Sequence, residues 1–146
     1  MPQTAFVSTE TFTQDEFEVW LADLPSQDDN HYELLNGSIV MSPPAGWPHG
    51  NVGARIVRIL GNCTTQAQLG EVFDSSTGYR LPSGDTVEPD VSFISSARLQ
   101  AGPAPQRGKF LQIVPSLVVE ILSTPTAARD RTAKKTIYES NGVEEY

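Results

Sequence analysis

Residues 117–122, LVVEIL, constrain the fold of this chain more than any other segment. Successive side chains of a strand point to opposite faces, and both faces of this segment are apolar except at Glu120. That pattern predicts a central strand covered on both sides, as in a sheet flanked by helices. A buried carboxylate is costly unless it is paired or binds a cation. Glu120 is therefore interpreted either as half of a salt bridge or as a metal ligand.

The remaining patterns predict one α/β (α+β) domain with a mixed β-sheet flanked by helices. We expect residues 1–12 to be a flexible lead-in and residues 13–146 to form the domain. Residues 143–146 begin an extended segment, so a further strand is expected beyond them and the domain is expected to be truncated at its C-terminus. The elements follow the order αββαβββα: a helix that begins at Thr13 and stops before Pro25, a hairpin over 32–41 turning at Asn36-Gly37, a helix over 49–67, strands over 71–81, 86–95 and 113–122, a polar loop over 97–110, and a helix over 127–140.

Composition excludes several classes of protein. The chain has 146 residues, enough for one domain with a core. No segment reaches the roughly 20 apolar residues of a membrane-spanning helix, and the N-terminus lacks the features of a signal peptide. Cys63 is the only cysteine, which excludes an internal disulfide, and only His31 and His49 could join it in a metal cluster. We expect a cytoplasmic protein without a membrane partner, with Cys63 in the core rather than acting as a nucleophile.

The charge is distributed unevenly along the chain. The net charge is −8, which by itself argues against a nucleic-acid partner. Residues 1–40 hold eight acids and no Lys or Arg, whereas the other 106 residues hold 10 acids and 10 bases. The acid excess therefore belongs to the N-terminal segment, and binding to nucleic acid is weakened but not excluded.

Two more carboxylates stand in settings that conflict with their charge. Asp90 follows Pro89 at the entrance of a predicted strand, where it is either a turn aspartate or part of a site. Glu33 lies between an aromatic residue and two leucines in the predicted hairpin, so it too is expected to be partly shielded. His49 begins the long helix and is interpreted as a helix-entry or surface residue.

The last predicted helix carries a lysine in its apolar face. At about 100° per residue, Lys134 falls between Ile137 and Tyr138 on a helical wheel. One interpretation is an apolar stem that reaches solvent, or a pair with Asp130. The other is an ammonium directed into the same site as Glu120.

Two carboxylates and one ammonium suit metal-dependent hydrolysis of a phosphodiester. Carboxylates hold Mg²⁺ together with several waters, and the metal activates a bound water and neutralises charge on the phosphate. A lysine would orient the water or stabilise developing negative charge. The chain contains no phosphate-binding loop, dinucleotide fingerprint, nucleophile elbow or zinc-protease motif.

The same residues occur in an order that resembles the Uma2 family, also called DUF820, of restriction-endonuclease-like proteins. The resemblance covers about residues 12–146, and it is carried by five segments: 32–37 (YELLNG), the Ser42-Pro43…His49 loop, 88–91 (EPDV), 115–123 (PSLVVEILS), and Lys134…Tyr138…Gly142-Val143…Glu145-Tyr146. It implies the fold of the PD-(D/E)xK nuclease superfamily and Mg²⁺-dependent cleavage of DNA, with Mn²⁺ as a substitute. Many nucleases of this kind are dimers, so a homodimer is a further expectation.

The resemblance assigns roles to four residues. Asp90 corresponds to the aspartate of the PD element, and Glu120 to the acid of (D/E)xK, so these two are the expected metal ligands. The lysine of that element should stand at Leu122, and in this family it has moved to the next helix, at Lys134. Glu33 corresponds to an additional acid on the first core element of the superfamily. These four residues form the predicted catalytic set.

Two other functions stay open at this point. The chain could be a non-catalytic module that binds nucleic acid or a protein partner, with a Glu120–Lys134 pair that serves stability alone. The acidic composition favours that alternative. Hydrolysis of a phosphodiester other than a nucleic acid is a third hypothesis.

Overall fold

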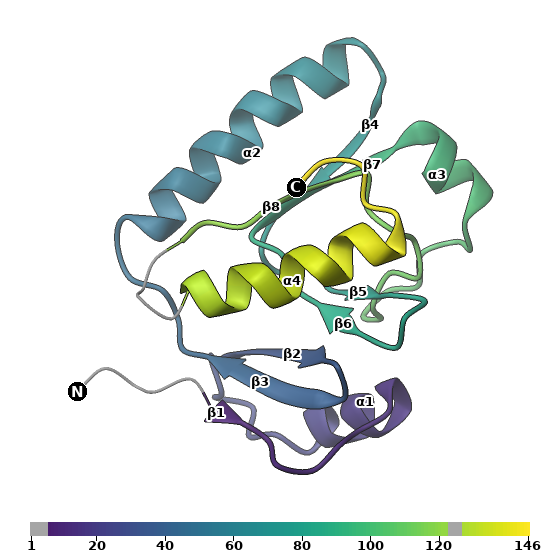
Figure 1. The fold of residues 1–146 in the computed structure, drawn as a ribbon. Coiled ribbons are helices and arrows are strands. Elements are labelled where there is room, and N and C mark those ends of the chain that lie inside the picture. The colour runs from purple at the N-terminus through teal and green to yellow at the C-terminus, as the bar shows by residue number, and fades with distance from the viewer. Residues whose placement is uncertain (1–5, 123–126) are drawn as a thin grey trace.

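The computed structural model describes residues 6–122 and 127–146, and it confirms an α+β domain (Figure 1). Four helices and eight strands are assigned within these residues. Their bounds are β1 Phe6–Val7, α1 Gln14–Ala22, β2 His31–Leu35, β3 Ser38–Ser42, α2 His49–Gln66, β4 Gly70–Phe73, β5 Tyr79–Arg80, β6 Thr86–Val87, β7 Val91–Ser95, α3 Ser96–Ala101, β8 Leu117–Val119 and α4 Ala127–Asn141.

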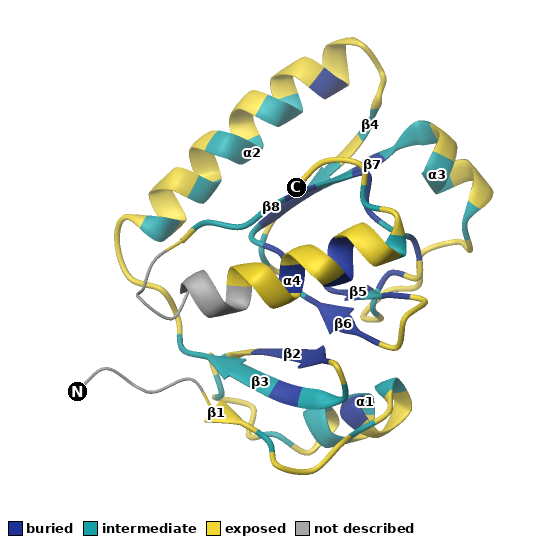
Figure 2. Cartoon of the chain, in the orientation of Figure 1, coloured by how far each residue is buried: buried dark blue, intermediate teal, exposed yellow. Residues whose placement is uncertain are grey.

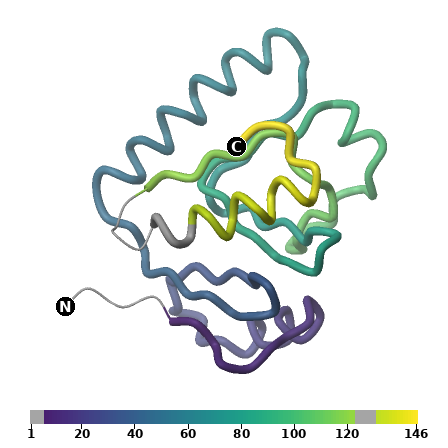
Figure 3. Tube along the Cα trace, in the orientation of Figure 1, coloured from purple at the N-terminus to yellow at the C-terminus, as the bar shows by residue number. Residues whose placement is uncertain are grey.

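The strands form two antiparallel sheets instead of the single mixed sheet that was predicted. One sheet has the order β1-β3-β2-β6-β5, and the other has the order β4-β7-β8. Parallel pairing within the described residues is limited to two isolated bridges, Tyr79–Leu111 and Leu117–Glu145. The second bridge places the extended C-terminal residues beside β8, where the Val118 N–H donates to the Glu145 carbonyl at 3.0 Å. Figure 3 shows this end of the chain next to β8.

The three predicted long strands are shorter in the structure, and two of them are divided between the sheets. The segment 71–81 becomes β4 and β5, because Asp74 accepts a hydrogen bond from the Ser76 N–H at 2.9 Å and makes a turn. The segment 86–95 becomes β6 and β7, because Pro89 cannot donate to a ladder. The third, 113–122, keeps only β8. The chain therefore passes from one sheet to the other at residues 88–90, which places Asp90 between them.

The β2–β3 hairpin has the predicted turn. Asn36 and Gly37 have φ values of 51° and 81°, and a type I′ turn requires positive φ at both positions. The five-residue register from His31–Ser42 to Leu35–Ser38 is continuous. This register fixes Glu33 opposite Val40, in the middle of the hairpin.

The N-terminal part packs on the five-stranded sheet. Thr13 caps α1 with a capping box to Glu16, and α1 buries Phe17 against Tyr32, Leu34 and Ile39. Residues 6 and 7 lie in the segment expected to be a flexible lead-in, but they form β1 and pair with β3. These two residues therefore add a short edge strand to β3.

Two helical regions also differ from expectation. The predicted loop over 97–110 contains most of α3, which is capped by the Ser95 side chain. Along α2, Thr64 is the buried residue, and Cys63 is exposed instead of lying in the core. Figure 2 shows that α2 is largely exposed. Within the described residues, one face of the helix packs on the rest of the molecule, against β4 and β7.

The larger core lies between the three-stranded sheet, β5, β6 and α4. Its largest fully buried members include Tyr79, Tyr138 and Ile94. The α4 helix crosses this core with Ile137 and Tyr138 buried, as its periodicity predicts, and Lys134 is buried beside them at 8% exposure. None of the described helices is long and apolar enough to cross a membrane.

Candidate active site

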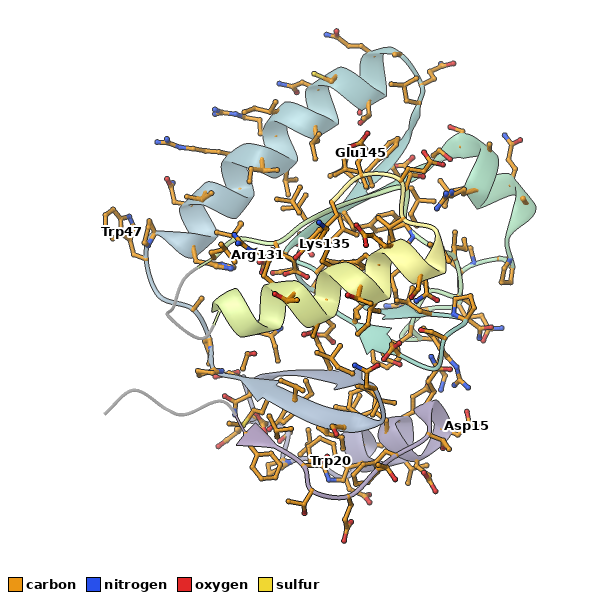
Figure 4. The ribbon with its side chains drawn as sticks, viewed as in Figure 1. Asp15, Trp20, Trp47, Arg131, Lys135 and Glu145 are labelled. Carbon is orange, nitrogen blue, oxygen red and sulfur yellow. The ribbon has the colours of Figure 1, made fainter. Side chains whose placement is uncertain are left out.

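The elements of both sheets and α4 bring the predicted residues to one region. Glu33 is at the centre of β2, Asp90 immediately precedes β7, Glu120 immediately follows β8, and Lys134 lies on α4. The end of β8 places Glu120 against α4, and the crossing of the chain at Pro89 places Asp90 beside the backbone N–H of Ile121. Figure 4 shows α4 with its exposed residues Arg131 and Lys135 labelled, while Lys134 is buried.

The Lys134 ammonium joins two carboxylates from different elements. Its Nζ lies 2.9 Å from Glu33 Oε1 and 2.7 Å from Glu120 Oε1. The Tyr138 hydroxyl donates to the same Glu120 oxygen at 2.7 Å, and the Glu88 backbone N–H donates to Glu33 Oε1 at 2.8 Å. The structure therefore assembles Glu33, Glu120 and Lys134 into one hydrogen-bonded group, here called the Lys134 cluster, with Tyr138 as its fourth member.

Burial and charge shift the pKa values of this cluster. Burial raises the pKa of Glu120 to about 7, and the negative charge of Glu33 adds to this while Lys134 opposes it. Burial on its own would lower the pKa of Lys134, but the charges of Glu33 and Glu120 outweigh it and raise the pKa. Burial, and then the charge of Glu120, raise the pKa of Tyr138 well above its ordinary value. Lys134 therefore remains an ammonium and Tyr138 a hydrogen-bond donor, while Glu120 is the group that titrates near neutral pH.

Asp90 is adjacent to the Lys134 cluster and is held by other partners. Its Oδ2 accepts the backbone N–H of Ile121, the residue after Glu120, at 2.6 Å. Its Oδ1 lies 3.0 Å from Nε2 of His49 at the start of α2. Asp90 is thus joined to the backbone beside Glu120 on one side and to α2 on the other.

The donor chemistry of Asp90 and Glu120 fits Mg²⁺. Both supply hard carboxylate oxygens, and Mg²⁺ is commonly held by one or two carboxylates while it keeps several waters. Within the described residues, no group of three or more His, Cys, Asp and Glu side chains forms a complete metal cage. A metal held by these two residues would therefore keep much of its hydration shell.

Sequence reasoning left two site residues without a role. His49 was interpreted as a helix-entry or surface residue, yet its side chain is 17% exposed and contacts Asp90. Tyr138 was assigned only to the apolar face of α4, next to Lys134, and its hydroxyl binds Glu120. Two features of the sequence could have indicated these roles. His49 lies in the 42–49 loop that carries the family resemblance, and Tyr138 places a polar hydroxyl on a buried helix face. The alternative partner proposed for Lys134 is the Asp130 side chain, and the structure describes only the backbone of residues 127–130.

Comparison with known proteins agrees with the fold. Residues 15–146 match the Uma2 family, which is described as "Putative restriction endonuclease". Among solved structures, the chain resembles a protein from Anabaena variabilis ATCC 29413, described as "a putative nuclease belonging to DUF820", with 21% sequence identity and a TM-score of 0.62. The likeness covers 82% of this chain and 65% of that chain, so the present chain spans just under two thirds of its length. No curated protein matches the sequence. Because the family match extends over nearly the whole chain, the protein belongs to the Uma2 family.

Proposed function

We propose that this protein is a metal-dependent endonuclease that hydrolyses DNA phosphodiester bonds through a PD-(D/E)xK-type site with a migrated lysine. The observation that supports this most is the buried Lys134 ammonium between Glu33 and Glu120, at 2.9 and 2.7 Å. A protein that needed only a stable core would gain little from burying three charges, because desolvation offsets their attraction. Family membership supplies the reaction class, and the cluster supplies residues suited to it.

Each residue has a distinct role in the proposed reaction. Asp90 and Glu120 would hold Mg²⁺ through carboxylate oxygens. When bound, the metal lowers the pKa of a coordinated water and neutralises charge on the phosphate. Lys134 keeps its proton and stabilises the negative charge that develops on the phosphate oxygens. Glu33 helps to position the ammonium, and Tyr138 orients the shared Glu120 oxygen.

The raised pKa of Glu120 gives the proposed site a pH requirement. A ligating carboxylate must be ionised, so metal binding competes with the proton on Glu120. Metal affinity is therefore expected to increase as the pH rises through about 7. Lys134 would keep its charge over the same range.

The distribution of charge is compatible with a nucleic-acid substrate despite the acidic composition. Three of the N-terminal acids form ion pairs within the molecule: Glu33 pairs with Lys134, and Asp15 and Glu18 pair with Arg80. Residues 34–70 contain no acid, and the two bases of this segment, Arg55 and Arg58, are exposed on α2. The exposed bases Arg131 and Lys135 lie on α4 (Figure 4). We propose that DNA approaches the side of the molecule that carries α2 and α4.

A non-catalytic binding module is the second candidate. It is favoured by the contacts within the Lys134 cluster, in which the ammonium already pairs with both carboxylates. In that case the cluster would be a structural ion-pair network, and the protein would bind nucleic acid or a partner without cleaving it.

Calorimetric titration with Mn²⁺ and Mg²⁺ separates the two candidates. The nuclease proposal expects the wild type to bind at millimolar concentration or tighter, and Glu120→Gln and Asp90→Ala to lose binding. Glu88→Gln is the matched control, because this carboxylate is close in sequence to Asp90 but pairs with His31. Metal-dependent cleavage of DNA by the wild type and Glu88→Gln, and not by the site variants, completes the test. Equal cleavage by all four proteins would contradict the proposal, and absence of metal binding would favour the binding module.

A further inference from the structure

The two histidines of the chain form two similar pairs in different settings. His31 Nδ1 lies 3.2 Å from Glu88 Oε2, and His49 Nε2 lies 3.0 Å from Asp90 Oδ1. The His31 side chain is 45% exposed, whereas the His49 side chain is 17% exposed. The His49 pair is therefore the one shielded from water, and it involves a carboxylate of the candidate site.

Both oxygens of Asp90 have a fixed partner. The Ile121 N–H donates to Oδ2 at 2.6 Å, and His49 Nε2 lies 3.0 Å from Oδ1. The two partners come from different elements, so together they set the plane of the carboxylate. Two oxygens offer about four lone-pair positions, which leaves room for a further ligand.

The path of α2 holds His49 against this carboxylate. The helix packs on β4 and β7. One turn after His49, a Cβ added at Gly53 would lie 3.4 Å from Ile121 Cδ1. Gly53 therefore lies beside the side chain of Ile121, the residue whose backbone N–H binds Asp90. His49, Gly53, Ile121 and Asp90 thus form a closed set of contacts between α2 and the site.

We propose that His49 is a positioning residue that orients Asp90 for metal binding, through the 3.0 Å contact between Nε2 and Oδ1. This inference rests on the proposed function, because it concerns the affinity of the same site. A group that holds a ligating carboxylate typically changes metal affinity by roughly 10–100-fold when it is removed. His49 itself need not touch the metal or the substrate.

The test compares the Mn²⁺ affinity of four histidine variants by calorimetry. His49→Gln carries an amide nitrogen at the position of Nε2, whereas His49→Asn carries it at the position of Nδ1. We expect His49→Ala and His49→Asn to bind Mn²⁺ roughly 10–100-fold more weakly, and His49→Gln to recover most of the affinity. His31→Ala, the matched control, is expected to bind like the wild type.

Thermal unfolding by circular dichroism accompanies each titration. The Gln and Asn variants are expected to unfold at similar temperatures, so a difference in their Mn²⁺ affinity reports on position and not on stability. This pair also decides the question if His49→Ala fails to fold. Wild-type Mn²⁺ affinity in His49→Asn, or a loss of affinity in His31→Ala equal to that in His49→Ala, would overturn the positioning role. If Asp90→Ala still lost Mn²⁺ binding, the proposed function would stand. A wild type that binds no Mn²⁺ would overturn both.

Discussion

Two basic side chains of this protein each pair with two carboxylates, and only one of these groups is buried. Arg80 lies 2.7 Å from Asp15 and 3.0 Å from Glu18 of α1, and the Asp15 side chain is 83% exposed. Lys134 has similar distances to Glu33 and Glu120, but all three side chains are at most 14% exposed. Exposed pairs are screened and contribute little to stability, whereas buried charges are strongly coupled to one another. The geometry is similar, so burial is what distinguishes a surface contact from a candidate active site.

Removal of the Lys134 charge is expected to have the largest effect on stability. Lys134→Met leaves Glu33 and Glu120 buried without their ammonium, and breaking such a pair costs about 3–5 kcal/mol. Urea unfolding at pH 8 measures this loss. At pH 5 the loss is expected to be smaller, because Glu120 can take up a proton and become neutral. An equal loss at both pH values would show that lost packing, and not charge, explains the effect.

Neutralisation of Glu120 is expected to change how stability depends on pH. The folded-state pKa of Glu120 is raised above its ordinary value of 4.5 to about 7. Between these values the native state binds more protons than the unfolded state, so Glu120 makes stability decrease as the pH rises. The slope from one such group is at most about 1.4 kcal/mol per pH unit.

Glu120→Gln should remove this part of the slope while it preserves the shape of the side chain. Unfolding free energies of the wild type and variant, measured from pH 4.5 to 8, give the comparison. Glu139→Gln is the matched control, because Glu139 lies on α4 with its side chain 64% exposed. Parallel pH profiles for the wild type and Glu120→Gln would contradict the raised pKa.

The comparison also explains how much could be predicted from sequence. Glu120 and Lys134 attract attention because each is a charge within an apolar pattern, and local periodicity is enough to show that conflict. The structure then places them 2.7 Å apart. The contact between His49 and Asp90 has no such signature, because it depends on how closely α2 approaches β7 and Ile121.

Some features of the fold could likewise be predicted from the sequence, and others could not. The class of the domain, the β2–β3 hairpin and the span of α2 follow from turn chemistry and periodicity. The assignment of β6 and β7 to different sheets does not, although Pro89 marks the place where the ladder ends. Whether consecutive strand segments share a sheet depends on their contacts with distant strands. Those contacts leave no local pattern in a single sequence.

The Arg80 group, which is more exposed than the Lys134 cluster, should respond weakly to the same kind of substitution. Arg80→Met removes the contacts to Asp15 and Glu18, and we expect a loss of about 0–1 kcal/mol. High salt should reduce this difference further, because it screens exposed charges. Urea unfolding at low and high salt measures both effects. A loss as large as that of Lys134→Met would show that burial is not what separates the two groups.

The His31–Glu88 pair is expected to give the smallest effect, and it tests the comparison through pH. The hydrogen bond with Glu88 raises the pKa of His31, and the charges of Glu88, Glu33 and Asp90 add to this while burial opposes it. A raised histidine pKa means that the stabilisation is fully present below the unfolded value, near pH 6.5, and is lost as the pH rises through the folded value. Because His31 is nearly half exposed, screening keeps the contribution small. His31→Gln should therefore lower stability slightly at pH 5.5 and leave it unchanged at pH 8.5, as measured by thermal unfolding at the two pH values. If the loss were instead larger at pH 8.5, neutral His31 would be the stabilising form, and the pair would depend on packing rather than on charge.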